Sequence, residues 1–87
     1  MLRPAEFFGE RELALIYIAK RLSEAKKLEG VLTAAGLDYL VEPDRYHGGI
    51  IFRSERVGAF FYVPEETAEA ARRVLQDHGY RPLGPVG

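Results

Sequence analysis

The residues best suited to chemistry lie close together between positions 43 and 56. Asp44, His47 and Ser54 are an acid, a base and a hydroxyl of the kind that hydrolases combine into a nucleophilic triad. Such a triad needs a serine held beside the histidine and an oxyanion site nearby, and spacing within one loop supplies neither. We therefore expect no enzyme activity and no catalytic residue. A small hydrolase that uses residues 44–54 is the second alternative function.

The same segment contains a stronger candidate for binding. Two consecutive glycines expose backbone amides, and three arginines supply positive charge, which together suit an anion. We predict a ligand-binding site for a small anionic molecule or a protein partner, formed by Arg45, Tyr46, His47, Gly48, Gly49, Arg53 and Arg56. The competing interpretation is a plain glycine turn flanked by solvated arginines.

The chain has few residues that suit a metal or cofactor site. The chain has no cysteine, and its two histidines, His47 and His78, fall on different predicted elements. Zinc sites usually take several Cys or His ligands at close spacing. We therefore expect no metal site and no cofactor, and the dipole of a helix explains a histidine near its C-terminus.

Two aromatic stretches raise the question of nucleic acid. Ile16-Tyr17-Ile18 and Phe60-Phe61-Tyr62 are similar to the strands on which RNA-recognition motifs stack bases. The twelve basic side chains are balanced by thirteen acidic ones, however, so no overall basic field draws phosphates to the chain. A single-stranded nucleic-acid-binding domain, with Tyr17 and Phe61 as stacking platforms, is therefore the first alternative function.

Length and composition predict one cytoplasmic domain over residues 1–87, with residues 1–10 as an N-terminal arm. A chain of 87 residues can bury a core without disulfides. No apolar run approaches a membrane span, and the start of the chain lacks the pattern of a signal peptide. There is no asparagine and one glutamine, while glutamate and arginine dominate the charge, which favours a thermophile or a GC-rich genome.

Apolar spacing and turn residues predict the elements that must position these side chains. Residues 13–18 and 57–63 are apolar on both faces and are predicted as strands. Residues 23–35 are predicted as a helix that Ser23 caps and Gly36 ends, and residues 65–78 as a helix that Gly79 ends. Gly30, inside the first helix, predicts that the sheet approaches its backbone closely.

The remaining segments are less regular. Residues 38–41 are predicted as a strand that Pro43 closes. Residues 43–56 are predicted as a loop with a short apolar run at 50–52 and a turn at 54–56. The tail 80–86 contains two prolines, so it can form an edge strand or a strap but not a central strand.

An internal repeat orders these elements. Sliding the chain along itself aligns Val31-Leu32 with Val74-Leu75, Gly36 with Gly79, and Leu37 with Tyr80. Two copies of strand, helix and glycine stop predict a ferredoxin-like βαββαβ fold of the α+β class. We expect an antiparallel sheet with strands 13–18 and 57–63 adjacent at its centre, both helices on one face, and room for one extra short strand. Leu32 and Leu75 should be buried against that sheet.

These elements carry a resemblance to a known family. The first helix contains Glu24-Ala25, Leu28, Gly30, Leu32 and Ala35-Gly36-Leu37, and the second opens with Val63-Pro64-Glu65-Glu66-Thr67-Ala68. Over residues 17–76 the chain resembles a family of small bacterial signal-transducing domains whose fold is related to that of the nitrogen-regulatory P-II proteins. The resemblance implies a ferredoxin-like domain with a regulatory or binding role, and it supplies no catalytic residue. It does not extend to the nucleotide-binding motifs of the P-II proteins.

A sheet with helices on one face leaves the other face uncovered, and here aromatic side chains would occupy it. Burial in a homodimer, with Phe7 and Phe8 at its rim, is a common way to cover such a face. We therefore predict a homodimeric regulatory or interaction module that contacts no membrane. Its partner would be an unknown protein or a small anionic ligand.

Overall fold

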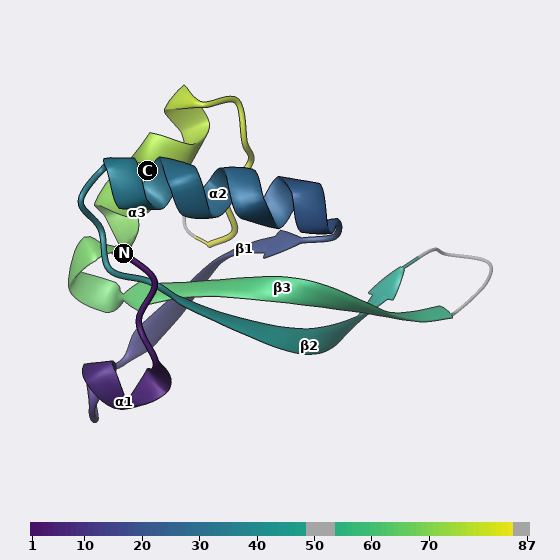
Figure 1. Ribbon diagram of the computed structural model, residues 1–87, viewed down its shortest axis with the longest axis horizontal. Helices are drawn as coiled ribbons and strands as arrows, with labels where there is room; N and C mark the ends of the chain where they lie inside the picture. The colour runs from purple at the N-terminus through teal and green to yellow at the C-terminus, as the bar shows by residue number, and fades with distance from the viewer. Residues whose placement is uncertain (49–53, 85–87) are drawn as a thin grey trace.

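The computed structural model describes residues 1–48 and 54–84 and shows an α+β architecture (Figure 1). The elements follow in the order α1 Ala5–Phe8, β1 Leu13–Ala19, α2 Leu22–Ala34, β2 Leu40–Gly48, β3 Ser54–Pro64 and α3 Glu65–Asp77. The three strands form one antiparallel sheet. Helices α2 and α3 cover one face of this sheet, as predicted, and the single turn α1 lies on the other side. None of the helices among the described residues is long and apolar enough to cross a membrane.

The strand order is β1-β3-β2, with β3 in the middle. β1 pairs with β3 from Leu13↔Pro64 to Ala19↔Ala59, which confirms that the two predicted strands are neighbours. The prediction that both lie at the centre is wrong for the described sheet. No strand pairs with the outer side of β1 within residues 1–48 and 54–84, so β1 is an edge strand.

The tail crosses the outer edge of β1 as a strap. The N–H of Leu83 donates to the carbonyl of Ile16 at 2.7 Å, but no strand is assigned over residues 80–84. Two features explain why the contact does not extend. Pro82 has no N–H to donate, and a register shift between Leu15 and Tyr17 leaves Ile16 as an extra residue in β1.

The segment predicted as a loop is largely a β-hairpin. β2 continues through Pro43 and Asp44 to Gly48, and residues 54–56, predicted as a turn, begin β3. Pro43 is tolerated because β2 is an edge strand, where a missing N–H leaves no partner strand unsatisfied. The apolar run predicted at 50–52 lies outside the described residues.

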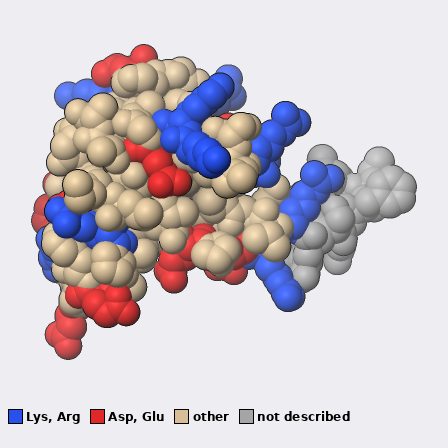
Figure 2. Space-filling view, in the orientation of Figure 1, with Lys and Arg blue, Asp and Glu red and all other residues tan. Residues whose placement is uncertain are grey.

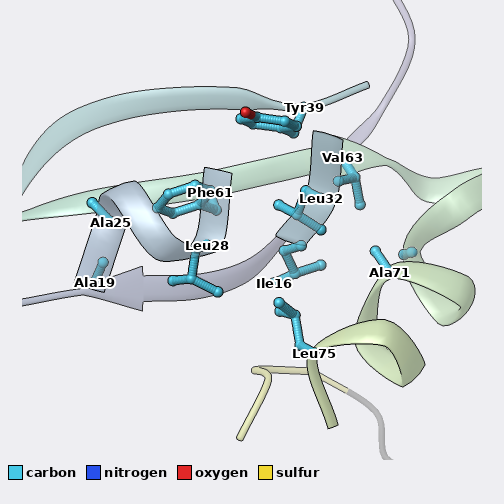
Figure 3. Close-up of a cluster of buried hydrophobic side chains, with 11 residues drawn as sticks. Ile16, Ala19, Ala25, Leu28, Leu32, Tyr39, Phe61, Val63, Ala71 and Leu75 are labelled. Atoms are coloured by element: carbon cyan, nitrogen blue, oxygen red, sulfur yellow. The ribbon is translucent and has the colours of Figure 1, made fainter. Parts of the chain in front are cut away.

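The main core lies between the sheet and the two long helices (Figure 3). Leu28 and Leu32 of α2 and Leu75 of α3 are fully buried, which confirms the prediction for Leu32 and Leu75. The remaining members of the cluster are Ile16, Ala19, Ala25, Tyr39, Phe61, Val63, Ala68 and Ala71. The hydroxyl of Tyr39 also contacts α2, because it donates a hydrogen bond to the carbonyl of Glu29 at 3.1 Å.

Helix α2 begins one residue earlier than predicted and is not capped by Ser23. Its N-cap residue is Arg21, whose side chain makes no capping hydrogen bond. The carboxylate of Glu24, in the first turn of the helix, accepts hydrogen bonds from the N–H of Lys20 at 3.3 Å and from the hydroxyl of Tyr17 at 3.1 Å. The end of β1 and the first turn of α2 are therefore tied together by one carboxylate.

Both long helices end as predicted. Gly36 and Gly79 adopt positive φ values of 76° and 85°. The residue after each glycine turns back, so that the N–H of Leu37 donates to the Leu32 carbonyl and the N–H of Tyr80 to the Leu75 carbonyl. This hydrogen-bond pattern satisfies helix carbonyls that would otherwise have no partner.

The N-terminal arm, residues 1–10, packs beside the start of β2. Leu2 forms a parallel bridge with Tyr39, and Arg3 donates to the carboxylate of Asp38 at 2.9 Å. That hydrogen bond holds the pKa of Asp38 below its usual value. Phe8 is 2% exposed, so the arm buries an aromatic side chain and does not leave both phenylalanines at the rim of an open face.

Gly30 contradicts the expectation that the sheet approaches its backbone. The residue is exposed, and a Cβ atom placed on it would meet nothing within 4 Å outside its own helix backbone and chain neighbours. The glycine therefore has no packing role in the described structure.

Replacing Gly30 by alanine should raise the free energy of unfolding by about 1 kcal/mol, because alanine is the better helix former and nothing obstructs its methyl group. Urea denaturation of the two proteins measures the difference. Gly36→Ala is the matched control, since its positive φ strains an alanine and should lower the stability. A loss of stability in Gly30→Ala would contradict the prediction.

Candidate binding site

The predicted ligand-binding residues lie on the β2–β3 hairpin. Arg45 and Tyr46 are on β2, followed by His47 and Gly48, while Arg56 is on β3. Gly49 and Arg53, the other two members of the predicted set, lie outside the described residues.

The register separates two of the predicted arginines. Arg45 is opposite Val57, and Arg56 is opposite Tyr46. Residues opposite each other share a face of a sheet, and successive residues alternate. Arg45 and Arg56 therefore lie on opposite faces of the hairpin, and Tyr46 shares its face with Arg56.

The hairpin does not bring the three hydrolase positions together. Asp44 is opposite Gly58, whereas Ser54 is opposite Gly48. These two pairs are roughly 13 Å apart along β2 at the usual rise of a strand, which is well beyond a hydrogen bond. The Asp44 carboxylate instead accepts a hydrogen bond from the N–H of Arg45 at 2.7 Å.

The two predicted stacking platforms are not on the face of the sheet that α2 and α3 leave open. Phe61 is fully buried in the main core. Tyr17 is opposite Phe61 and therefore shares its face, and its hydroxyl donates to Glu24. The open face carries other side chains, among them the half-buried Leu15, Ile18 and Tyr62.

Gly58 lets Tyr46 lie across the central strand. A Cβ atom on Gly58 would come within 2.9 Å of Cγ2 of Ile18 and within 3.0 Å of Cε1 of Tyr46. The ring of Tyr46 therefore occupies the space that a side chain on β3 would take, and it reaches from β2 towards β1. A glycine inside a strand of apolar residues was a signal in the sequence for such a close approach.

A hollow of about 380 Å³ opens beside Tyr46, and we call it the Tyr46 hollow. Its lining residues are Tyr17, Ile18, Lys20, Tyr46, Arg81 and Leu83. The Nζ atom of Lys20 lies 5.5 Å from the centroid of the Tyr46 ring, which is within the range of a cation–π interaction. Arg81 and Leu83 come from the strap that crosses the edge of β1.

The charged residues that line the Tyr46 hollow are both basic. Lys20 and Arg81 line it, and no Asp or Glu does. The ion pairs found in the described parts of the chain involve neither of these two cations. An anion in the hollow would therefore not have to displace a carboxylate of the protein.

Sequence reasoning found Tyr46 but missed Lys20 and Arg81. Lys20 follows β1 and Arg81 lies in the tail, so only the pairing of β1 with β3 and the path of the strap bring them near the hairpin. No local pattern around either residue indicates this. Figure 2 shows Lys and Arg side chains around the place where the hairpin leaves the body of the molecule.

Metal binding finds no support in the described residues. Over residues 1–48 and 54–84, no three His, Asp or Glu side chains lie close enough together to hold an ion. His78, at the end of α3, has its Nδ1 atom 2.9 Å from the Val74 carbonyl of the same helix.

Comparisons of the chain with protein-family models, with curated proteins and with solved structures find no match. The resemblance to the signal-transducing domain family therefore remains a prediction. The support for a function comes from the geometry of the hairpin, the strap and the end of β1.

Burial, together with the hydrogen bond to Glu24, raises the pKa of Tyr17 from 10.0 to about 12. The folded protein then keeps the Tyr17 proton at a pH where the unfolded chain loses it. This contribution to stability is fully present below pH 10 and is lost as the pH rises through about 12.

The difference in unfolding free energy between the wild type and Tyr17→Phe should therefore be constant below pH 10 and fall towards pH 12. Urea denaturation over this range gives the difference at each pH. Burial also raises the pKa of Tyr39 and Tyr62, but both proteins keep these residues, so their effect cancels. A difference that stays constant through pH 12 contradicts the assignment.

Proposed function

We propose that this chain is a small regulatory or interaction module that binds an anionic ligand in the Tyr46 hollow. The observation that carries the proposal is the position of Lys20 over the Tyr46 ring, with Arg81 lining the same hollow. We also propose that the fold is ferredoxin-like, and that the strap takes the place of a fourth strand beside β1. The order β1-β3-β2 and the bond between Leu83 and Ile16 support this.

The lining of the hollow restricts the class of ligand. Lys20 and Arg81 favour a phosphate or carboxylate, while Ile18, Leu83 and the Tyr46 ring offer apolar contacts. The volume of about 380 Å³ lies within the usual range for small-molecule pockets, about 300 to 1,000 Å³. A metabolite with one anionic group and one planar apolar group fits these properties best.

The two alternative functions have less support. The nucleic-acid alternative named Tyr17 and Phe61 as platforms, and both face the helices. The hydrolase alternative named Asp44 and Ser54, which the register places far apart. Arg56 shares a face of the hairpin with Tyr46 but is not among the residues that line the Tyr46 hollow. Arg45 lies on the other face.

Phosphate-bearing and carboxylate-bearing aromatic metabolites should raise the melting temperature of the wild type in a saturable way. The reason is mass action, since a ligand that binds only the folded state stabilises it. Thermal melts with a panel of nucleoside monophosphates and aromatic acids test this. Inorganic phosphate serves as the ligand without a planar group.

Tyr46→Ser and Arg81→Gln should each abolish the rise in melting temperature. Arg73→Gln is the matched control, because Arg73 is an exposed arginine on α3 that pairs with Glu69 at 3.6 Å, and it should keep the full rise. Equal rises in all four proteins would place the ligand elsewhere. No rise with any member of the panel would contradict the proposal.

We further propose that the open face pairs two copies of the chain. Phe8, Leu40 and Phe60 are the buried hydrophobic residues that lie outside the main cluster, and the register places Leu40 and Phe60 on the open face. Beside them Leu15, Ile18 and Tyr62 are half-buried. Leu40 and Phe60 are already covered within one chain, so the half-buried side chains are the apolar surface that a second copy can cover.

Sedimentation velocity at micromolar concentration should therefore show a dimer. Leu15→Glu should shift the chain to a monomer, because it places a charge among the apolar side chains of the proposed contact. Glu69→Lys on α3 is the control, since its charge change lies on the other side of the sheet, and it should leave the dimer intact. A wild type that sediments as a monomer contradicts the dimer.

A further inference from the structure

A second hollow lies between the start of α2 and the hairpin, on the face of the hairpin opposite to Tyr46. The hairpin extends past the start of α2 (Figure 1). We call it the α2–hairpin groove, and its volume is about 290 Å³. Its lining residues are Ala19, Lys20, Arg21, Leu22, Ala25, Val41, Pro43, Val57, Gly58 and Ala59. Apart from Lys20 and Arg21, the lining residues are apolar, and four of them are alanine or glycine.

Two side chains at the groove are exposed in a way that the fold does not explain. Val57 is 66% exposed although it belongs to the central strand β3. Leu22, the first residue of α2, is 73% exposed. A single exposed apolar residue is ordinary, but two large ones on opposite sides of an apolar groove indicate a surface that another group can cover.

The charges at the groove have one sign. Lys20 and Arg21 line it, and no Asp or Glu does. The one carboxylate at the start of α2, that of Glu24, already accepts hydrogen bonds from Tyr17 and from the N–H of Lys20. Arg45 is opposite Val57 and lies on the same face of the hairpin.

We propose that the α2–hairpin groove docks a short acidic segment of a partner protein. One apolar side chain of the segment sits between Leu22 and Val57, and its carboxylates lie near Lys20 and Arg21. Charge complementarity selects this occupant, because a basic segment would be repelled by Lys20 and Arg21 and a neutral one would gain nothing from their charge. The proposal does not rest on the Tyr46 hollow, which lies on the other face of the hairpin.

Selection of the wild-type chain against a displayed library of random short peptides tests the proposal. The enriched peptides should combine acidic residues with at least one large apolar residue. Enrichment of basic or uncharged peptides, or no enrichment, overturns it.

Fluorescence anisotropy with one enriched peptide then locates the contact. Serine in place of the apolar residue, or lysine in place of the acids, should weaken binding about tenfold or more, and added salt should weaken it further. Leu22→Ser and Arg21→Gln should each weaken binding by a similar factor. Leu2→Ser is the matched control, because Leu2 is 49% exposed on the N-terminal arm, and it should bind as the wild type does.

Urea denaturation of each variant separates a lost contact from a lost fold. A Leu22→Ser protein that keeps its stability and its full peptide affinity overturns the proposal. Arg81 lines the Tyr46 hollow and not the groove, so Arg81→Gln should abolish metabolite binding and leave peptide affinity unchanged, which distinguishes failure of one site from failure of the other. Loss of peptide affinity in Arg81→Gln would assign the peptide to the Tyr46 hollow and would contradict docking in the groove.

Discussion

The carboxylate of Glu24 fixes the junction on which both hollows depend. It accepts hydrogen bonds from the hydroxyl of Tyr17 and from the N–H of Lys20, and so joins the end of β1 to the first turn of α2. Lys20 lies between these two elements and lines the hollow on each side of the hairpin. The N-cap residue Arg21 offers no side-chain acceptor to the start of the helix, because a guanidinium group only donates hydrogen bonds.

The main core accounts for the body of the molecule but not for the hairpin. Leu28, Leu32 and Leu75 bring α2 and α3 onto the part of the sheet that lies near Tyr39 and Phe61. Beyond the start of α2, no helix among the described elements covers the hairpin (Figure 1). The hydrophobic effect therefore explains the layered body, while strand pairing with β3 holds the outer part of β2.

The sequence predicted best the features that local chemistry determines. Gly36 and Gly79 end both helices because a positive φ suits glycine, and Leu32 and Leu75 are buried because their spacing matches one helix face. Gly30 was misread, since a glycine in a helix need not mark a contact. The hairpin was missed because Pro43 is a poor strand residue everywhere except at an edge, and no local pattern reveals which strand is an edge.

In the candidate site, too, the sequence predicted only what local patterns determine. Tyr46 was identified from a local cluster of arginine and glycine, but the residues that accompany it in the hollow come from β1 and the strap. Which face each arginine takes follows from the register, since Arg45 is opposite Val57 and Arg56 is opposite Tyr46. A shift of one residue in that register would turn the side chains of β2 to the opposite faces, so that Tyr46 would no longer share a face with Arg56. The pairing of β2 with β3 thus determines which side chains each face of the hairpin presents, and this pairing cannot be deduced from Tyr46 or Gly58 alone.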